Sequence, residues 1–404
     1  MRLKINKEIL LYFFLLFFFI EPAFLQRNTY IHTIYTFGQM FSTLLLIFIY
    51  VLKKIKPSKI IILLWLVLIG MIFSTFHGLG DIRSTLAAYL CYVGLSMWFD
   101  IYVRKNPKGC FDMIVLLLDI YVLINFASFV LFPNGLYISQ SYQNEPYVCW
   151  FFGYKNPQIR ILLPYVALLF ARDSIFRKKI KYTTYIKLFL IALITLKLKS
   201  STGIVSVFTF IMLNLIFSNN KESKLKKFIL KIMNIRNVYI FMLVLYILIV
   251  FFQFQNNFSY IIVNVLHKDL DLTDRIFVWL NVIPVIKTHL LFGQGVLNAT
   301  ISRGYIGASH AHNYMLNTLY NGGLVSLVLL SIIWIIAGQK SLKYVNSNGV
   351  RYLKFMAIIF LIMGITESLT VTVLLYPILI LISHSDMLEG IECYGGNQLE
   401  KNNK

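Results

Sequence analysis

The sequence predicts an all-α fold, a polytopic transmembrane helical bundle with about 12 spans. The chain of 404 residues is 58% hydrophobic and only 14% charged, whereas soluble globular domains average about 45–50% and about 25%. Its apolar residues also gather in blocks free of charge, such as 60–76 and 238–252. Because lipid offers no hydrogen-bond partners to a backbone, apolar blocks that cross a bilayer must be helical.

Twelve segments of the chain are apolar enough to be spans. The first follows Arg2, Lys4 and Lys7, as in a signal peptide, but no small-residue cleavage site follows it, so we expect it to be retained. Residues 1–388 are expected to form a single transmembrane domain, and 389–404 a polar cytoplasmic tail. The expected spans lie near 8–26, 30–52, 58–76, 82–101, 111–132, 157–171, 184–197, 201–218, 238–254, 312–337, 353–370 and 372–386.

The distribution of basic residues predicts the orientation of these spans. A net charge of +21 first suggests nucleic acid, but the lysines and arginines lie in short groups between apolar blocks, which is typical of cytoplasmic loops. We therefore expect no nucleic-acid partner. Loops on the side of the N-terminus hold 25 of these residues and loops on the other side hold 10. The positive-inside rule then puts both termini in the cytoplasm, in a multi-pass protein of the cytoplasmic (inner) membrane.

This orientation leaves two long segments outside, near 133–156 and 255–311. The second is the large extracytoplasmic loop expected between spans 9 and 10. Within it, residues 275–291 have helical apolar spacing around Pro284, which predicts a kinked helix on the membrane surface.

The strongest candidate for chemistry is the stretch 309–316, where this loop becomes a helix. His312 lies at that transition, and an imidazole with a pKa near 6.5 suits a general base; the alternative is a histidine that caps the helix. His310 and His312 also have the spacing of two zinc ligands, but a third ligand is not evident. An acidic motif in the same loop, Asp269-Leu270-Asp271, either holds a divalent cation or caps the following helix.

Several basic residues on the outer side oppose the positive-inside bias. Arginine binds phosphate oxygens through two parallel hydrogen bonds, so a lipid diphosphate at the outer interface would account for them. Contact with lipid headgroups is the alternative. Glu367 falls inside an expected span, where a carboxylate is costly and marks a functional site or the partner of an arginine. The basic candidates on this side include Arg160, Lys199, Arg275 and Arg303.

Together these residues resemble the O-antigen ligase/polymerase superfamily, which includes the Wzy-type polymerases. The resemblance rests on the Arg-Trp segment at 274–279, the Phe-Gly-x-Gly turn at 291–295 and the His-Asn helix that runs from 312 to 323. The Gly…Asn segment at 152–156 and the Glu-containing segment at 365–368 are similar to further parts of the family pattern. At the turn 199–203, Lys199 stands where family members commonly carry an arginine.

The resemblance implies a membrane glycosyltransferase that polymerises undecaprenyl-diphosphate-linked oligosaccharide repeat units on the outer face of the membrane, for O-antigen, capsule or exopolysaccharide. His312 is the expected base, although His310 is an alternative, and Arg275 and Glu367 complete the expected catalytic set. No cofactor and no metal are expected. The expected diphosphate- or substrate-binding residues are Arg160, Lys199, Arg303, Asn313, His310 and Asn156.

Two other functions fit the same architecture. An O-antigen ligase would transfer the glycan to a surface lipid, and a flippase or other transporter would move it. A transporter predicts charges at mid-membrane positions and inverted repeats, whereas the polar groups here gather in an outer loop. Besides the lipid-linked oligosaccharide and the bilayer, flippase and chain-length regulator proteins are candidate partners.

Overall fold

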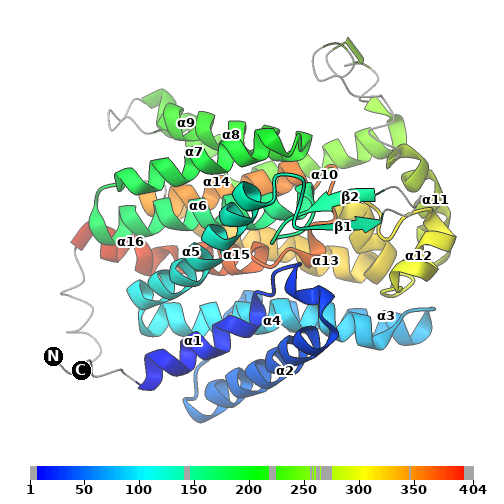
Figure 1. Cartoon of the computed structure of the whole chain (residues 1–404), viewed down its shortest axis with the longest axis horizontal. Coiled ribbons are helices and arrows are strands. Elements are labelled where there is room, and N and C mark those ends of the chain that lie inside the picture. Colours follow the sequence, from blue (N-terminus) through cyan, green and yellow to red (C-terminus); the bar gives the residue numbers. More distant parts are fainter. Residues whose placement is uncertain are drawn as a thin grey trace.

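The computed structural model describes residues 7–140, 146–217, 224–254, 275–344 and 347–394, together with 257, 259, 260 and 264. The described chain is almost entirely helical (Figure 1). Its first part contains α1 (Lys7–Phe19), η1 (Leu25–Arg27), α2 (Thr29–Leu52), α3 (Lys59–His77), α4 (Ile82–Lys105), α5 (Pro107–Leu131), β1 (Tyr137–Gln140) and β2 (Pro146–Cys149). Its second part contains α6 (Lys155–Arg177), α7 (Tyr182–Lys197), α8 (Ser201–Phe217), α9 (Lys224–Ile232), α10 (Ile235–Phe252), α11 (Arg275–Thr288), α12 (Ala299–Ile306), α13 (Tyr314–Lys343), α14 (Asn348–Met363), η4 (Leu369–Val371), α15 (Leu375–Ser383) and α16 (Ser385–Tyr394).

Six of the described helices are long and apolar enough to cross a membrane, namely α2, α3, α4, α5, α10 and α13. They confirm the prediction of an all-α membrane protein. By length and composition, the described helices do not account for about 12 spans, because several of the remaining helices are short. For example, α1 has 13 residues and α15 has 9. The higher number stays a prediction.

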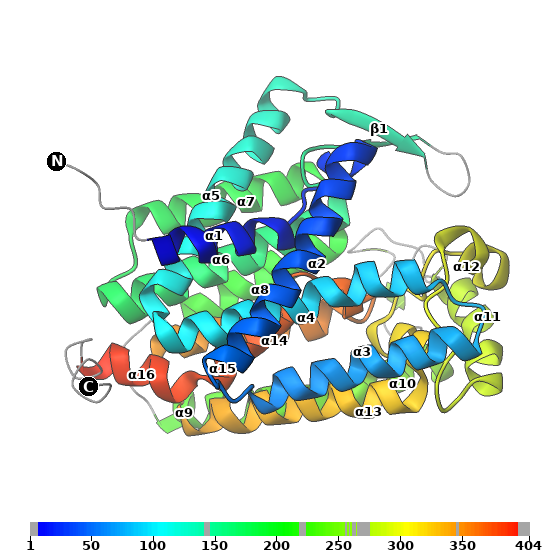
Figure 2. The same cartoon turned by 90° about the horizontal axis from the view of Figure 1, so that it is seen from below.

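The helices run between two ends of an elongated bundle (Figures 1 and 2). The start of α1 and helix α16 lie at one end. The hairpin of β1 and β2 lies at the opposite end, together with α11 and α12. Helices α6, α14 and α15 are buried along most of their length and form the centre of the bundle.

Local sequence explains where many of these helices begin. Side chains at the N-caps accept hydrogen bonds from the first free backbone N–H groups, which would otherwise lack partners. Asn106 does this for α5, whose first residue is Pro107, and Ser347 does it for α14. Asn28, Ser58 and Asp81 cap α2, α3 and α4 in the same way.

The last two expected spans differ most from the structure. We placed Glu367 inside a helix at 353–370, but α14 ends at Met363, and residues 364–374 form a buried irregular segment that contains only η4. The expected span at 372–386 is divided at His384 into α15 and α16. An apolar segment is compatible with such a break when the surrounding protein satisfies its backbone groups.

Helix α16 extends past residue 389, where the tail was expected to begin. The carboxylate of Glu392 holds it against the start of α14, because it accepts hydrogen bonds from the N–H groups of Asn348 and Gly349, both at 3.1 Å. A carboxylate is favourable at a helix N-terminus, where the partial charge is positive.

The Phe-Gly-x-Gly turn fills a second break, inside α13. Gly323 has a φ of 63° there, outside the helical region. The backbone N–H groups of Gln294 and Gly295 donate to the carbonyl oxygens of Tyr320 and Asn321 at 2.7 and 3.0 Å. A Cβ atom on Gly293 would lie 2.6 Å from the backbone of Asn321. The turn therefore supplies hydrogen-bond partners that the broken helix lacks, and it needs glycine to come this close.

Candidate functional site

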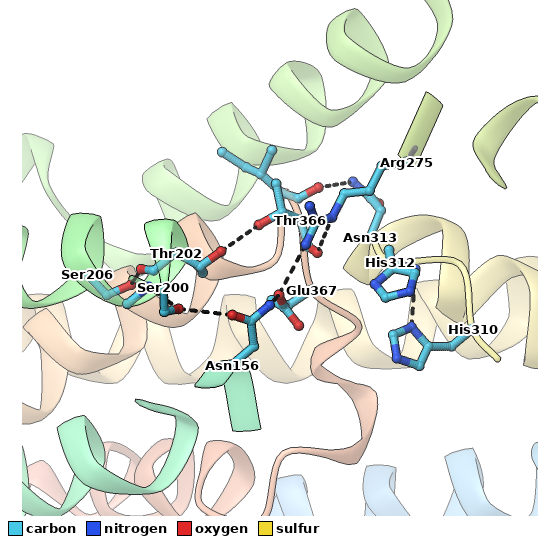
Figure 3. Close-up of polar contacts among 12 residues, drawn as sticks. Asn156, Ser200, Thr202, Ser206, Arg275, His310, His312, Asn313, Thr366 and Glu367 are labelled. Atoms are coloured by element: carbon cyan, nitrogen blue, oxygen red, sulfur yellow. Dashed lines mark hydrogen bonds and ion pairs between the residues drawn. The ribbon is translucent and has the colours of Figure 1, made fainter. Parts of the chain in front are cut away.

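Glu367 lies at the centre of a polar cluster near the end of the bundle that carries α11 and α12 (Figure 3). Its side chain is nearly buried, with 7% exposed. Its Oε1 atom accepts a hydrogen bond from Nδ2 of Asn156 at 2.8 Å and lies 3.4 Å from Nη2 of Arg275. Residues 156, 275 and 367 come from α6, from α11 and from the irregular segment 364–374, so the carboxylate joins three distant parts of the chain.

Arg275 is held by two kinds of contact. Its Nε donates to the backbone carbonyl of Thr366 at 3.0 Å, and its Nη2 contacts Glu367. The carbonyl is available because residues 364–374 leave the helical hydrogen-bond pattern. Burial lowers the pKa of the guanidinium, and Glu367 opposes this shift; arginine nevertheless stays charged in proteins. The cluster thus contains a fixed positive charge at the first residue of α11.

The side-chain amide of Asn156 is oriented by Ser200, in the turn between α7 and α8. Ser200 Oγ donates to Asn156 Oδ1 at 2.9 Å, so the NH₂ group of the amide faces Glu367. Ser200 also accepts a hydrogen bond from the N–H of Gly203 in the first turn of α8. The hydroxyls of Thr202 and Thr366 are 3.2 Å apart and join the same turn to the segment 364–374.

His310 and His312 lie next to one another before α13, with their ring centroids 4.0 Å apart. The backbone N–H of His312 donates to Nδ1 of His310 at 3.3 Å. Nδ1 of His312 is buried and has no hydrogen-bond partner within the described residues. His312 also has a φ of 48°, in the left-handed region that costs energy for a residue with a Cβ atom.

Both imidazoles are neutral at physiological pH. Burial is the main cause that lowers the pKa of His310 to about 4, and Arg160 and Arg275 add to it. Burial lowers the pKa of His312 further, with added contributions from His310, Arg275 and Arg160. A neutral imidazole with an unpartnered nitrogen is able to accept a proton.

Glu367 experiences opposing influences. Burial raises the pKa of its carboxyl group, whereas Arg160, Arg275 and the amide of Asn156 lower it. The net direction is upward. The two arginines and the amide therefore offset part of the cost of burying a carboxylate at this position.

Asn313 connects the histidine segment to the segment 364–374. Its Oδ1 accepts from the N–H of Leu316 and caps α13, while its Nδ2 donates to the carbonyl of Ile365, both at 3.1 Å. The N–H of Tyr314 donates to the carbonyl of Gly364 at 2.9 Å. Both polar ends of the Asn313 side chain are thus engaged within the protein, although we predicted that it binds substrate.

The remaining residues that we predicted to bind the diphosphate or the substrate have no described hydrogen bond to Glu367 or to the histidines. Arg160 on α6 influences the pKa of both histidines and of Glu367, yet it makes no hydrogen bond or ion pair within the described residues. Lys199 is exposed, with a φ of 52°, and its side chain has no contact with the described part of the cluster. Arg303 is half-buried on α12, and the described contacts do not join it to Glu367 or the histidines. The acidic motif at 269–271 lies outside the described residues.

Sequence reasoning missed Ser200, Thr202 and Thr366. The run Ser200-Ser201-Thr202-Gly203 has the composition of a helix N-cap, which indicates a turn but not that the turn contacts Asn156, 44 positions away. It also missed two buried hydroxyls of the irregular segment, Ser368 and Thr372, whose oxygens have no partner within the described chain.

The fold and this cluster together define a class: a membrane protein of many helices with a buried site of histidine, arginine and glutamate toward one end. The O-antigen ligase family model matches residues 186–331, a range that includes Arg275 and both histidines. The match bears out the resemblance to the O-antigen ligase/polymerase superfamily. It supports an O-antigen ligase/polymerase-type membrane enzyme, which transfers glycosyl groups from a lipid-linked glycan. A comparison with curated proteins gives no match.

Proposed function

We propose that this protein is a polymerase that joins undecaprenyl-diphosphate-linked oligosaccharide repeat units at the outer face of the cytoplasmic membrane. The observation that carries the proposal is the unpartnered Nδ1 of a neutral His312 in a cluster that also holds Arg160, Arg275 and Glu367. The elements at this end of the bundle, α11, α12 and the hairpin, are small. We favour a polymerase over a ligase because modest outer elements suit an acceptor that is itself a lipid-linked repeat unit.

The reaction needs one proton acceptor and one source of positive charge. A hydroxyl of the acceptor sugar attacks the anomeric carbon of the donor and gives its proton to the imidazole of His312. The bond between the anomeric carbon and the diphosphate oxygen breaks, and its electron pair stays on the diphosphate. Arginines that are already in place stabilise the charge that develops there. The transfer then requires neither a nucleotide sugar nor a metal ion.

Arg160 and Arg275 have different roles in this proposal. Two of the donor groups of Arg275 are engaged by Thr366 and Glu367, so its position is fixed before substrate binds. Arg160 has no hydrogen bond within the described residues, so its five N–H groups are available to a ligand. We infer that Arg160 contacts the diphosphate directly, and that Glu367 and Asn156 are positioning residues for Arg275.

The glycan pattern of a deletion strain tests the function. Single repeat units on the surface lipid indicate a polymerase. Long chains stranded on undecaprenyl diphosphate indicate a ligase instead, and repeat units trapped inside the cell indicate a flippase.

Complementation of that strain with His312→Ala tests the role of the base. We expect loss of polymer at an unchanged protein level, because the variant lacks the base that the proposed reaction assigns to His312. His289→Ala is the matched control, since His289 directly follows the last residue of α11 and is exposed, and its loss should leave polymer unchanged. Normal polymer from His312→Ala would show that His312 is not the base.

A further inference from the structure

An ion pair lies on the surface where α5, α6 and α7 pack together, and it takes no part in the cluster around Glu367. Nζ of Lys187 on α7 is 2.5 Å from Oδ1 of Asp119 on α5, and the two side chains are 32% and 34% exposed. The hydroxyl of Tyr165 on α6, which is fully buried, donates to the same carboxylate oxygen. Figure 2 shows α5 and α7 near one another along an edge of the bundle.

The depth of this pair makes its exposure unusual. Asp119 is the central residue of α5, a helix of 25 residues that is among the most apolar of the candidate spans. At a rise of about 1.5 Å per residue it lies about 18 Å from either end of the helix. That distance places it near the middle of a hydrocarbon layer about 30 Å thick. A charge that faces acyl chains at this depth is costly and indicates an interaction or a functional site.

The pair also has unused hydrogen-bonding capacity. Both bonds to the carboxylate end on Oδ1 of Asp119, and within the described residues Oδ2 has no partner. The ammonium of Lys187 has three N–H donors, and its hydrogen bonding within the described residues is limited to Asp119. The exposed part of the pair therefore offers one acceptor oxygen and two donor hydrogens, in a medium that supplies neither.

We propose that this face of α5 and α7 is the contact surface between two copies of the chain in the membrane. Two copies with the same orientation are related by a twofold axis along the membrane normal, which places their ion pairs at the same depth. Lys187 of each copy then donates to the unpaired Asp119 oxygen of the other. The ring of four charges is neutral, and polar contacts of this kind stabilise helix association in lipid.

The occupant follows from the charge of the face. One acid and one base lie side by side, so the face is complementary to itself under a twofold axis. An unrelated helix would have to carry its own acid and base at the same depth. Lipid headgroups do not reach the middle of the hydrocarbon layer, so they are not an alternative occupant.

The apolar residues around the pair fit the same packing. On α5, Leu116 and Leu123 lie three residues before and four residues after Asp119, so the three side chains share one face of the helix. Leu116 and Leu123 are 53% and 68% exposed, and Phe189 on α7 is 62% exposed. These side chains would surround the four charges and separate them from lipid.

Cysteine cross-linking in native membranes tests the proposal with the full chain. Leu123→Cys is introduced into a Cys393→Ser background, because Cys393 is exposed whereas the other three cysteines are buried. A short bifunctional maleimide should give a product of twice the mass of the chain. The matched control is Ile69→Cys, since Ile69 is 57% exposed near the middle of another candidate span, α3. Cross-linking at position 123 that does not exceed that at position 69, or a product with a mass other than twice that of the chain, would overturn the proposal.

Charge variants test whether the ion pair drives association. Asp119→Lys alone should lower dimerisation about tenfold or more, measured by single-molecule photobleaching in nanodiscs. The exchange Asp119→Lys with Lys187→Asp keeps the pair and its self-complementarity, so it should restore the dimer. If this double variant is correctly folded by its thermal midpoint but monomeric, the proposal is wrong. Because these readouts do not measure glycan transfer, they are independent of the proposed enzymatic function.

Discussion

His312 combines three local features, namely a left-handed backbone, burial and an unpartnered ring nitrogen. Each of these features is energetically unfavourable, so each is kept only where contacts with the surrounding structure hold the residue in place. The surroundings do so here, because Asn313 and Tyr314 fix the following backbone to the segment 364–374. The backbone at His312 is thereby held in place before α13 begins.

This environment predicts how the reaction depends on pH. A free histidine would lose its capacity as a base below a pH of about 6.5. The pKa of His312 is lowered, so its ring stays neutral and active well below that value. The rate of polymer formation in proteoliposomes should therefore change little between about pH 5 and 8. A steep loss of rate as the pH falls through 6.5 would contradict the role of His312.

Ser200 predicts a second effect at the scale of one residue. Ser200→Ala removes the hydrogen bond that orients the amide of Asn156, which is worth about 0.5–1.5 kcal/mol. The transfer rate at saturating substrate should fall about twofold to tenfold, because Glu367 and Arg275 lose a fixed neighbour. Ser201→Ala is the control, since Ser201 is exposed at the next position. Equal rates for the two variants would show that the Ser200 hydroxyl does not position the cluster.

At the scale of elements, the site depends on two breaks in long apolar segments. The irregular segment 364–374 supplies Glu367 and the carbonyl groups that bind Arg275 and Asn313. The break at Gly323 lets the turn at 291–295 dock against α13. Continuous helices would satisfy their own carbonyl groups, so neither set of contacts would form.

Substitution of Gly323, at the break in α13 where this turn docks, is expected to cause a large loss of stability. In Gly323→Ala, the added Cβ would overlap the carbonyl of Leu291, and the backbone would be held at a φ of 63°. We expect a loss of about 1–3 kcal/mol or more, visible as a lower thermal midpoint in detergent. Gly304→Ala on α12 is the control, because a Cβ there meets nothing within 4 Å. A thermal midpoint unchanged by Gly323→Ala would contradict the docking of the turn.

At the scale of the whole molecule, the arrangement separates the cluster from the end of the bundle that holds α16. Arg275 and the histidines lie toward the end that carries α11, α12 and the hairpin (Figures 1 and 3). The excess of basic residues in the expected cytoplasmic loops favours placing that end outside. The proposed donor, a lipid-linked glycan, would then meet the cluster from the outer leaflet.

This orientation can be tested by labelling. Gly304→Cys in a Cys393→Ser background should react with a membrane-impermeant maleimide in intact cells, because Gly304 is exposed on α12. The native Cys393, which is exposed on α16, should react only after the membrane is permeabilised. The opposite pattern would place the cluster in the cytoplasm and contradict the proposed function.

The sequence by itself determined the helical membrane architecture and the positions of most helices. Helix α11, for example, begins at Arg275 where its apolar spacing begins. These features are local, because an apolar segment in lipid has few alternatives to a helix. The sequence also singled out Arg275, Glu367 and His312 as candidates.

Only the tertiary structure decided how these residues meet. Hydropathy treats 353–370 as one span, because the apolar residues of this stretch outweigh the polar residues near its end. The contact between Arg275 and Glu367 joins positions 92 apart, and that between Asn156 and Glu367 joins positions 211 apart. The packing of α6, α11, α13 and the segment 364–374 against one another brings these side chains together, and no local pattern records that packing.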